Sequence, residues 1–398
     1  MLFRSATLDK EKLRQIVMAC PERTSISLYN FREYFKRVTN NLTEEEKAYT
    51  LFYWMSQNIA YDADGYFSGD TYVEPEETYN NGYSVCSGYS RLFKYIGDYL
   101  GLDIICVSGY AKGYSYNPNK KISGTNHEWN IIKFKGVYYQ IDSTWGAGSL
   151  NGREFEKELE EFYFCPKPEN LISSHFPEDS KWQLIYPPIS EEEFGKRVKF
   201  SSKFYDLFTT DIKYHIFKVK SKHTIRFNKI NEKDNLHASV NFYDKEGNET
   251  NDALYLVLYD KKYIEFLLLF KEKGTYQVKL YANYVKKTME HLVTFYLECE
   301  EDYIETPTTP FRLPKVYKSD VTIIEPIYNI LKKGEKVTLK FKSDVTDEII
   351  VTNRGWLTVK KNEDGIFETE IIVDTDSVYI GIKKENGNLR TCIIYDVY

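Results

Sequence analysis

Cysteine is scarce in this sequence and widely scattered. The 398 residues include six cysteines, at positions 20, 86, 106, 165, 299 and 392, and no two of them form a Cys-x-x-Cys pair. Disulfide-stapled domains and zinc sites built from paired cysteines need closer spacing, so both classes are excluded. We expect no metal and no cofactor.

An excess of charge of either sign is also missing. The chain has 53 Lys and Arg residues against 59 Asp and Glu residues, which leaves a net charge of −6. A protein that binds nucleic acid or an anionic membrane mainly through charge needs a clear positive excess. Neither nucleic acid nor a membrane is therefore expected as a partner.

Long apolar runs are absent too. The most apolar stretch, residues 254–270, is interrupted by the charged triplet 260–262, whereas a membrane-spanning helix needs about 20 apolar residues in a row. The first residues carry charges at positions 4 and 9–11 and lack the apolar core of a secretion signal. These features predict a cytoplasmic protein.

The character of the sequence changes near residue 190. Beyond residue 195, short apolar runs rich in aromatic residues are separated by turns that contain glycine, a spacing typical of β-sandwiches. Three prolines between residues 307 and 314 mark a linker. We therefore predict an N-terminal domain at 1–190, followed by sandwiches at 191–302 and 310–398.

Cys86 stands at the predicted start of a helix. Ser84 is the predicted N-cap, and Gly101 is the predicted stop. Free backbone N–H groups and the positive end of the helix dipole favour a thiolate in the first turn. Gly82 and Gly88 would let a substrate backbone approach. Apolar residues recur at helical spacing behind the cysteine: Leu92, Tyr95, Ile96, Tyr99 and Leu100.

Residues 127–142 have the pattern of a β-hairpin. Two strand-like segments flank Lys135-Gly136, a natural two-residue turn. In that register Asp142 opposes Trp129, so Asp142 and His127 are diagonal neighbours on one face, about 7–8 Å apart at the backbone. Their side chains are then within reach of each other.

Together, Cys86, His127 and Asp142 supply the parts of a nucleophilic thiol site: a thiolate, a base that generates it, and a group that orients the base. Each residue alone has a simpler interpretation. A single Cys is usually a small buried hydrophobe, a His in a strand is usually structural, and an Asp often starts a turn. The helix start, the hairpin and the chain order together favour the site.

The motifs around these residues resemble a known family. Three stretches resemble the core of the transglutaminase-like superfamily, and a fourth resembles the helix that precedes its cysteine helix: Gly82–Tyr89, His127–Asn130, Asp142–Gly146 and Trp54–Asp62. Segments 162–169 and 175–184 resemble the kyphoscoliosis peptidase branch more narrowly. The resemblance is strongest from about residue 50 to residue 190.

This resemblance implies an α+β fold: a papain-like, transglutaminase-like catalytic core followed by two β-sandwich (immunoglobulin-like) domains. It also implies a Cys-His-Asp triad in which Cys86, His127 and Asp142 hold the three family positions. All three are present, whereas some relatives lack the cysteine. The backbone N–H of Cys86 is one predicted oxyanion donor, and Trp54 and Tyr83 are candidates for the second.

Three other features were weighed as site elements. His175 is the second candidate, but its Phe-Pro and Trp-Gln-Leu neighbours predict a packed structural segment, which follows charged, helix-like sequence at the start of 150–190. Some transglutaminases bind calcium, but the acidic loop 61–82 lacks the spacing of a calcium-binding loop because Gly65 is misplaced. Segment 112–126 is predicted to be a surface loop beside the site, whose tyrosines contact substrate or are merely exposed.

The leading hypothesis is therefore a cysteine-dependent acyl-transfer enzyme that acts on a protein or peptide substrate. Hydrolysis of peptide or amide bonds is favoured, because the narrower resemblance lies on the peptidase branch. Transfer to an amine, or deamidation of glutamine, would use the same acyl-enzyme. A third hypothesis is a non-catalytic scaffold or cytoskeleton-associated protein that binds partners through its C-terminal β-domains.

Overall fold

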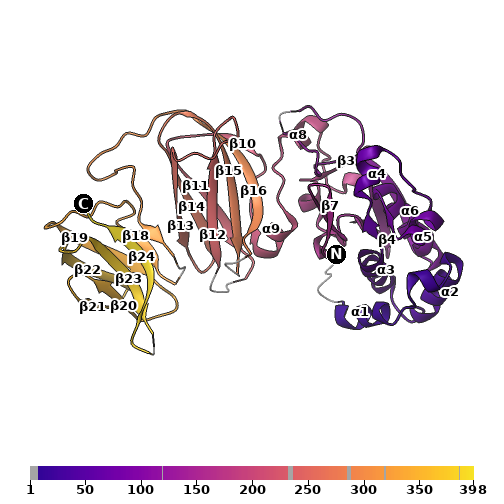
Figure 1. Cartoon of the computed structure of the whole chain (residues 1–398), viewed down its shortest axis with the longest axis horizontal. Helices are drawn as coiled ribbons and strands as arrows, with labels where there is room; N and C mark the ends of the chain where they lie inside the picture. The colour runs from indigo at the N-terminus through magenta and orange to yellow at the C-terminus, as the bar shows by residue number, and fades with distance from the viewer. Residues whose placement is uncertain (1–7, 119, 232–235, 285–287, 318–319, 385) are drawn as a thin grey trace. The chain divides into compact units, whose positions relative to one another are not determined.

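The computed structural model describes residues 8–118, 120–231, 236–284, 288–317, 320–384 and 386–398. The chain divides into two units, residues 1–197 and residues 198–398, which are described separately (Figure 1). The α+β class is confirmed, because the first unit mixes helices with an antiparallel sheet and the second consists almost entirely of strands. The three predicted domain boundaries stay predictions.

The first unit begins with three helices: α1 (Lys10–Met18), α2 (Leu28–Val38) and α3 (Glu44–Asn58), with the 3-10 helix η2 (Arg23–Ser25) before α2. Helix α3 starts with a capping box, since Thr43 and Glu46 exchange side-chain to backbone hydrogen bonds of 2.9 and 3.2 Å. Phe31 and Phe35, one turn apart on α2, are fully buried. These helices supply one wall of the core.

The predicted open loop at 61–82 is wrong, because this segment contains two short helices, α4 (Ala63–Ser68) and α5 (Pro75–Asn81). Its acidic side chains serve the helix starts. Asp62 Oδ1 accepts a 2.8 Å hydrogen bond from Gly65 N, and Glu74 and Glu77 form a capping box. Strands β1 (Ala60–Tyr61) and β2 (Tyr83–Ser84), paired in parallel, flank the two helices.

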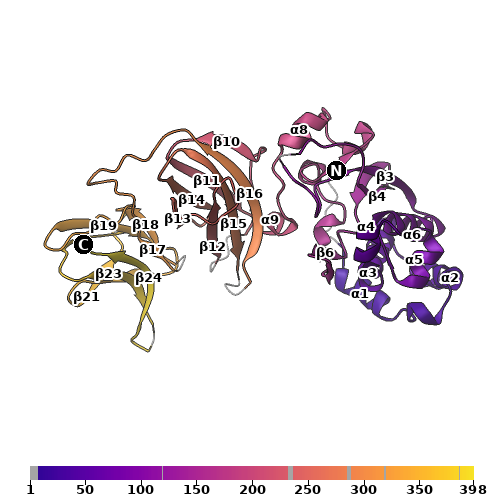
Figure 2. The same ribbon diagram turned by 45° about the horizontal axis from the view of Figure 1, so that its top comes forward.

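A four-stranded antiparallel sheet lies at the centre of the first unit. Its strand order is β5-β4-β3-β8, from β3 (Asp103–Ala111), β4 (His127–Phe134), β5 (Val137–Ile141) and β8 (His175–Pro177). The predicted hairpin register is confirmed from Phe134–Val137 to Asn130–Ile141, where the pairing of the two strands ends. Helix α6 (Cys86–Tyr99) packs against β3 and β4 (Figure 2).

The charged sequence after residue 147 forms a hairpin, so the predicted helical start is wrong. Strands β6 (Gly148–Asn151) and β7 (Glu154–Lys157) place Leu150 opposite Phe155. Side chains alternate between the two faces of a strand, but the many glutamates in this segment hide that alternation in the sequence. The chain then runs through short elements: η3 (Glu161–Tyr163), α7 (Pro168–Leu171), η4 (Ser180–Gln183) and α8 (Glu191–Lys196). Segment 112–126 is a loop, as predicted, in its described residues; residue 119 lies outside them.

The second unit contains two pairs of packed sheets. The first pair has strand orders β10-β16-β15-β12 and β13-β14-β11-β9, and buried side chains from both sheets form one core. Its elements are α9 (Ser202–Leu207), β9 (Phe208–Thr209), β10 (Ile216–Val219), β11 (Lys222–Lys229), β12 (His237–Tyr243), β13 (Ala253–Tyr259), β14 (Tyr263–Phe270), β15 (Gly274–Asn283) and β16 (Glu290–Cys299). This is a β-sandwich.

The second pair has strand orders β17-β24-β23-β20-β21 and β18-β19-β22, again with a shared core. Its strands are β17 (Lys315–Val316), β18 (Thr322–Glu325), β19 (Lys336–Lys342), β20 (Glu348–Thr352), β21 (Trp356–Lys360), β22 (Ile366–Ile372), β23 (Ser377–Lys383) and β24 (Leu389–Asp396). β-Sandwiches after residue 195 were the sequence prediction.

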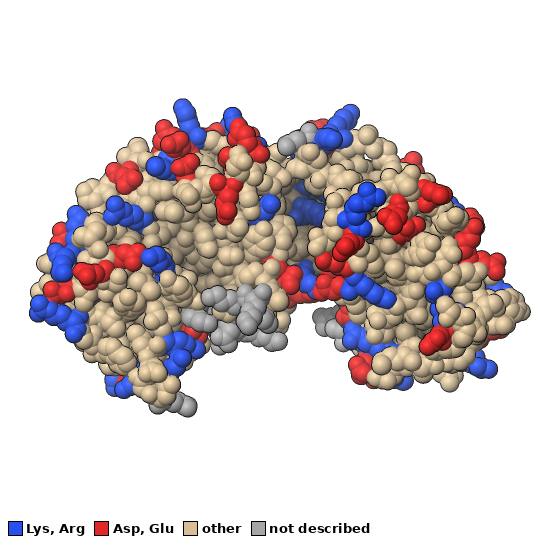
Figure 3. Space-filling view, viewed as in Figure 1, with Lys and Arg blue, Asp and Glu red and all other residues tan. Residues whose placement is uncertain are grey.

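The surface carries charges of both signs. Lys and Arg are interspersed with Asp and Glu on the face shown in Figure 3, as the near balance of charge in the sequence predicts. Among the described residues, no helix has the length and apolar character needed to cross a membrane.

Candidate active site

Cys86 is the first residue of helix α6, and its side chain is half-buried. Its place in the first turn is as predicted, but the predicted Ser84 cap is wrong. The residue that precedes the helix is Val85. Ser84 lies in β2 and its hydroxyl donates a 2.6 Å hydrogen bond to the carbonyl oxygen of Tyr72. In this first turn the N–H of Gly88 donates to the carbonyl oxygen of Val85 at 3.0 Å, whereas those of Cys86 and Ser87 precede any intrahelical acceptor.

Packing and backbone geometry explain the two glycines near Cys86, Gly82 and Gly88. A Cβ on Gly88 would lie 1.9 Å from Ser84 Oγ and 2.6 Å from Thr78 Oγ1, so α6 could not pack as it does. Gly82 ends α5 with φ of 77°, and the Arg23 side chain lies beside it. Chain packing and backbone geometry therefore account for both positions, and their part in substrate approach stays a prediction.

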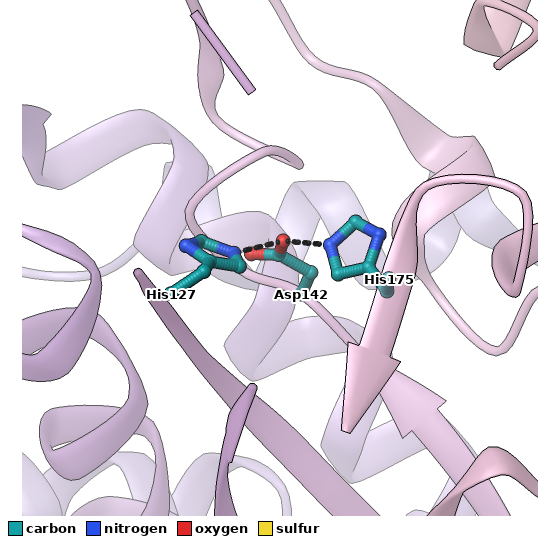
Figure 4. Close-up of side chains that lie close together, drawn as sticks. All are labelled: His127, Asp142 and His175. Carbon is teal, nitrogen blue, oxygen red and sulfur yellow. Dashed lines mark hydrogen bonds and ion pairs between the residues drawn. The ribbon is translucent and has the colours of Figure 1, made fainter. Parts of the chain in front are cut away.

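His127 begins β4 and is buried. Its Nε2 atom lies 2.7 Å from Asp142 Oδ2 (Figure 4), which confirms that the hairpin brings the two side chains within reach. Because Nε2 is engaged by the carboxylate, Nδ1 is the ring nitrogen left for Cys86, whose thiol interacts electrostatically with His127. Residues 15 apart in the chain are thus paired, and Cys86 is close enough to influence His127.

The electrostatics of the pair favour charge separation. Burial alone would lower the pKa of His127, but the Asp142 carboxylate and the Cys86 thiol raise this pKa to about 10. Burial alone would raise the pKa of Asp142, but His127 and then His175 hold it well below its usual range. An imidazolium beside an ionised carboxylate is the state that results.

The second oxygen of Asp142 is held by the backbone. Asp142 Oδ1 accepts hydrogen bonds from Thr144 N at 2.9 Å and from Trp145 N at 3.0 Å. This Asx-type turn follows directly after β5 and fixes the plane of the carboxylate. Oδ2 is thereby directed toward the two histidines.

His175 belongs to the same cluster, which the sequence prediction of a purely structural segment missed. Its Nε2 atom lies 2.9 Å from Asp142 Oδ2, and its side chain is fully buried. Strand β3 brings the two histidines together, because Gly109 pairs with His127 and Ala111 pairs with His175. The local sequence around His175 contains no signal for this pairing with a distant strand.

His127, Asp142 and His175 together have the donor set of a metal site. The two N–O distances of 2.7 and 2.9 Å are hydrogen-bond distances, whereas two ligands of one tetrahedral zinc ion lie roughly 3.3 Å apart. Protons therefore fit between these atoms better than a metal ion does.

Indole rings enclose the histidines. The Trp145 ring centroid lies 5.5 Å from that of His127 and 4.5 Å from that of His175, and Trp129 stacks on His127 at 5.9 Å. Trp54, one candidate for the second oxyanion donor, is buried in the helical core against Phe31. Tyr83, the other candidate, is exposed on β2.

Comparison with known proteins agrees with this geometry. Residues 32–143 match the family model of the transglutaminase-like superfamily, and this range contains Cys86, His127 and Asp142. The first unit contains a transglutaminase-like core.

Curated relatives are similar to this chain over about two fifths of its length. The chain is 31% identical to the kyphoscoliosis peptidase of Mus musculus over 165 residues, which cover 40% of this chain and 25% of that protein. It is 31% identical to the kyphoscoliosis peptidase of Homo sapiens over 168 residues, covering 41% and 25%. Hillarin of Drosophila melanogaster is 30% identical over 168 residues, covering 38% and 20%. The match thus spans about a quarter or less of each relative's length.

Proposed function

We propose that the first unit is a cysteine-dependent acyl-transfer enzyme that hydrolyses peptide or amide bonds in protein substrates. The observation that carries the proposal is a half-buried cysteine on the first residue of a helix, beside a buried His127–Asp142 pair. Relatives named as peptidases favour hydrolysis over the other reactions of the superfamily.

In the proposed mechanism, the Cys86 thiol has already given its proton to His127 Nδ1, which forms the imidazolium, and the sulfur then attacks the carbonyl carbon of the substrate. A carbon–sulfur bond forms, and the carbonyl π electrons move to the oxygen. The N–H groups at the start of α6, beginning with that of Cys86, are the donors available to this oxyanion.

His127 then gives its proton to the leaving nitrogen, the carbon–nitrogen bond breaks, and a thioester remains. In the second half of the reaction, His127 takes a proton from a water molecule, and the water oxygen attacks the thioester carbon. The carbon–sulfur bond then breaks, and the sulfur regains the proton from His127. Asp142 holds the imidazole through Nε2 and stabilises its cation in both halves of the reaction.

The first test is chemical modification of the thiol. Burial raises the pKa of Cys20 to about 11 and also raises the pKa values of Cys106, Cys165 and Cys299. We therefore expect iodoacetamide at neutral pH to label Cys86 well before these four, and His127→Gln to slow that labelling. Equal labelling of all the thiols would contradict a catalytic Cys86.

The reaction itself is tested with an unbiased proteome digest, in which wild type and Cys86→Ala are compared by mass spectrometry. New N-termini that depend on Cys86 would establish a peptidase. Gln–Lys crosslinks or deamidated glutamines that depend on Cys86 would establish transglutaminase chemistry instead, in which an amine or water resolves the acyl-enzyme.

A protein that lacks both products, yet captures the same partners in wild-type and Cys86→Ala form, would be a scaffold. The proposal includes three further predictions: that the substrates are proteins, that the β-sandwiches bind partners, and that the protein is cytoplasmic. Detection of the protein with an antibody in the fractions of broken cells tests the location independently of activity.

A further inference from the structure

One oxygen atom of Asp142 accepts two hydrogen bonds, and the proposed mechanism uses only one of them. Oδ2 lies 2.7 Å from His127 Nε2 and 2.9 Å from His175 Nε2 (Figure 4). Asp142 and His175 are each 1% exposed. The second histidine therefore competes with the first for the same lone pairs, out of reach of solvent.

The direction of these hydrogen bonds follows from the chemistry of the groups. An ionised carboxylate can only accept, so His175 must carry a proton on Nε2. Ser174 Oγ lies 2.8 Å from His175 Nδ1 and 3.2 Å from the carbonyl oxygen of Leu171. If the hydroxyl donates to Nδ1, His175 is neutral and carries its proton on Nε2; if the hydroxyl donates to Leu171, it accepts from Nδ1 and His175 is doubly protonated. A doubly protonated His175 would donate to Asp142 as well, so the donor role holds in both charge states.

We propose that His175 is a positioning residue that acts through Asp142: by sharing Oδ2 with His127, it limits how strongly the carboxylate holds the proton of the His127 imidazole. The inference rests on the proposed function, because it concerns the base of the same thiol site. It adds a fourth member, His175, to the chain Cys86–His127–Asp142.

The proposed reaction explains why two histidines would share Asp142 Oδ2. His127 must take a proton from the thiol and then release one to the leaving nitrogen, so a base that binds its proton too tightly is a poor acid. Asp142 and Cys86 already raise the pKa of His127 to about 10. A second donor on Oδ2 draws part of the carboxylate charge away from His127 and opposes a further rise.

Two phenols and one thiol are further titratable groups that interact with the pair. Tyr61 on β1 and Tyr89 on α6 interact electrostatically with Asp142, but burial raises the pKa values of both phenols, which keeps them neutral through the pH range of the reaction. Cys86 on α6 is a titratable partner of His127 that also raises its pKa. Replacing Cys86 therefore isolates the effect of His175.

The test is an NMR titration of the His127 ring in a Cys86→Ala background, with and without His175→Phe. The phenyl ring preserves the bulk of the imidazole but has no N–H group. We expect the pKa of His127 to rise by about one unit in the double variant, the size of one hydrogen bond to a charged group. His175→Gln is the matched control, because its side-chain amide retains a donor and should leave the pKa of His127 nearly unchanged.

A purely structural His175 would give a different result. An unchanged or lowered pKa of His127 in a folded His175→Phe variant would overturn the proposal. If that variant does not fold, Ser174→Ala takes its place, because loss of the hydroxyl at Nδ1 weakens the donor and should raise the pKa of His127 by a smaller amount. Nitrogen NMR of the wild type adds an independent check, since an unprotonated His175 Nε2 in the native protein would also overturn the proposal.

These readouts separate the two proposals. The titration needs no catalysis, so the inference can hold even if Cys86 proves unreactive. If Cys86 labels selectively but the titration of His127 is insensitive to His175, the proposed function stands and only the inference fails.

Discussion

At the scale of single residues, four hydrogen bonds hold the buried carboxylate of Asp142. Both of its oxygens accept two hydrogen bonds, from two backbone N–H groups on one side and two imidazoles on the other. A buried carboxylate is tolerated only when its charge is compensated in this way. Its substitution should therefore affect chemistry more specifically than packing.

Asp142→Asn should preserve the fold and disable the base. The amide oxygen can still accept from Thr144 N and Trp145 N, but the amide nitrogen then faces His127 as a donor. The imidazole is forced to accept at Nε2 and to carry its proton on Nδ1, where the thiol needs an acceptor. We expect kcat/KM to fall about 10³–10⁴-fold, by analogy with serine triads.

The measurement for this variant pairs activity with thermal unfolding. Asp179→Asn is the matched control, because the Asp179 carboxylate caps a 3-10 helix at Lys181 N on the surface and should leave activity intact. An Asp142→Asn enzyme with full activity would contradict the role of the carboxylate.

The charge state of His127 predicts how stability depends on pH. The pKa of His127 is raised in the folded protein, from 6.5 to about 10, so its stabilising contribution is complete below the unfolded value and is lost as pH rises through the folded value. The free energy of unfolding should therefore fall between about pH 7 and pH 10. In His127→Gln this decline should be smaller.

Tryptophan fluorescence during urea unfolding can measure this effect. Four of the five tryptophans, Trp54, Trp129, Trp145 and Trp182, lie in the first unit, so the signal reports mainly on the unit that contains His127. A parallel decline in wild type and His127→Gln would show that other groups cause the pH dependence.

At the scale of elements, the start of α6 depends on close packing against β2 and α5. Gly88→Ala should destabilise the first unit by about 1–3 kcal/mol, because the new methyl group overlaps Ser84 and Thr78 and the helix start must shift. The same shift should slow the labelling of Cys86. Urea unfolding and iodoacetamide labelling measure the two effects.

Gly195→Ala is the matched control for this substitution. Gly195 also lies in a helix, α8, but a Cβ there would meet only Ile122 Cδ1, at an ordinary 3.7 Å. The added methyl group should be neutral or slightly stabilising. Equal losses at Gly88 and Gly195 would mean that the contacts around α6 are not the cause.

At the scale of the whole molecule, the division into two units makes a prediction about truncation. A chain that ends at Arg197 should keep selective labelling of Cys86, because the site lies within residues 1–197. A chain that ends at Ser190 should be less stable, because it lacks α8. Phe194 of α8 stacks on Phe176 at 5.1 Å, and the carbonyl oxygens of Phe194 and Arg197 accept from buried Lys112 Nζ at 2.8 and 2.6 Å.

Thermal unfolding and iodoacetamide labelling of the two truncated chains test the prediction. The shorter chain leaves a buried ammonium group without these acceptors, a costly arrangement, so its unfolding temperature should be the lower of the two. Loss of labelling in the chain that ends at Arg197 would show that the second unit is needed for the site.

The sequence alone determined the parts of this protein that depend on near neighbours in the chain. The apolar stripe behind Cys86 defined α6, because residues three and four apart share a helix face. The Lys135-Gly136 turn set the register that places Asp142 beside His127, because a two-residue turn aligns its strands uniquely. The wrong predictions also have local causes: Ser84 looks like a helix cap, and the acidic segment 61–82 looks like a loop.

Only the tertiary structure decided what depends on distant partners. His175 reaches Asp142 because β8 pairs with β3, the strand that also holds β4. The Ser84 hydroxyl is directed to Tyr72 because β2 pairs with β1. Helix α8 lies in the first unit, where the carbonyl oxygen of Phe194 accepts a hydrogen bond from the buried Lys112 Nζ. No local spacing encodes such contacts, since they form only when segments remote in sequence meet in the folded chain.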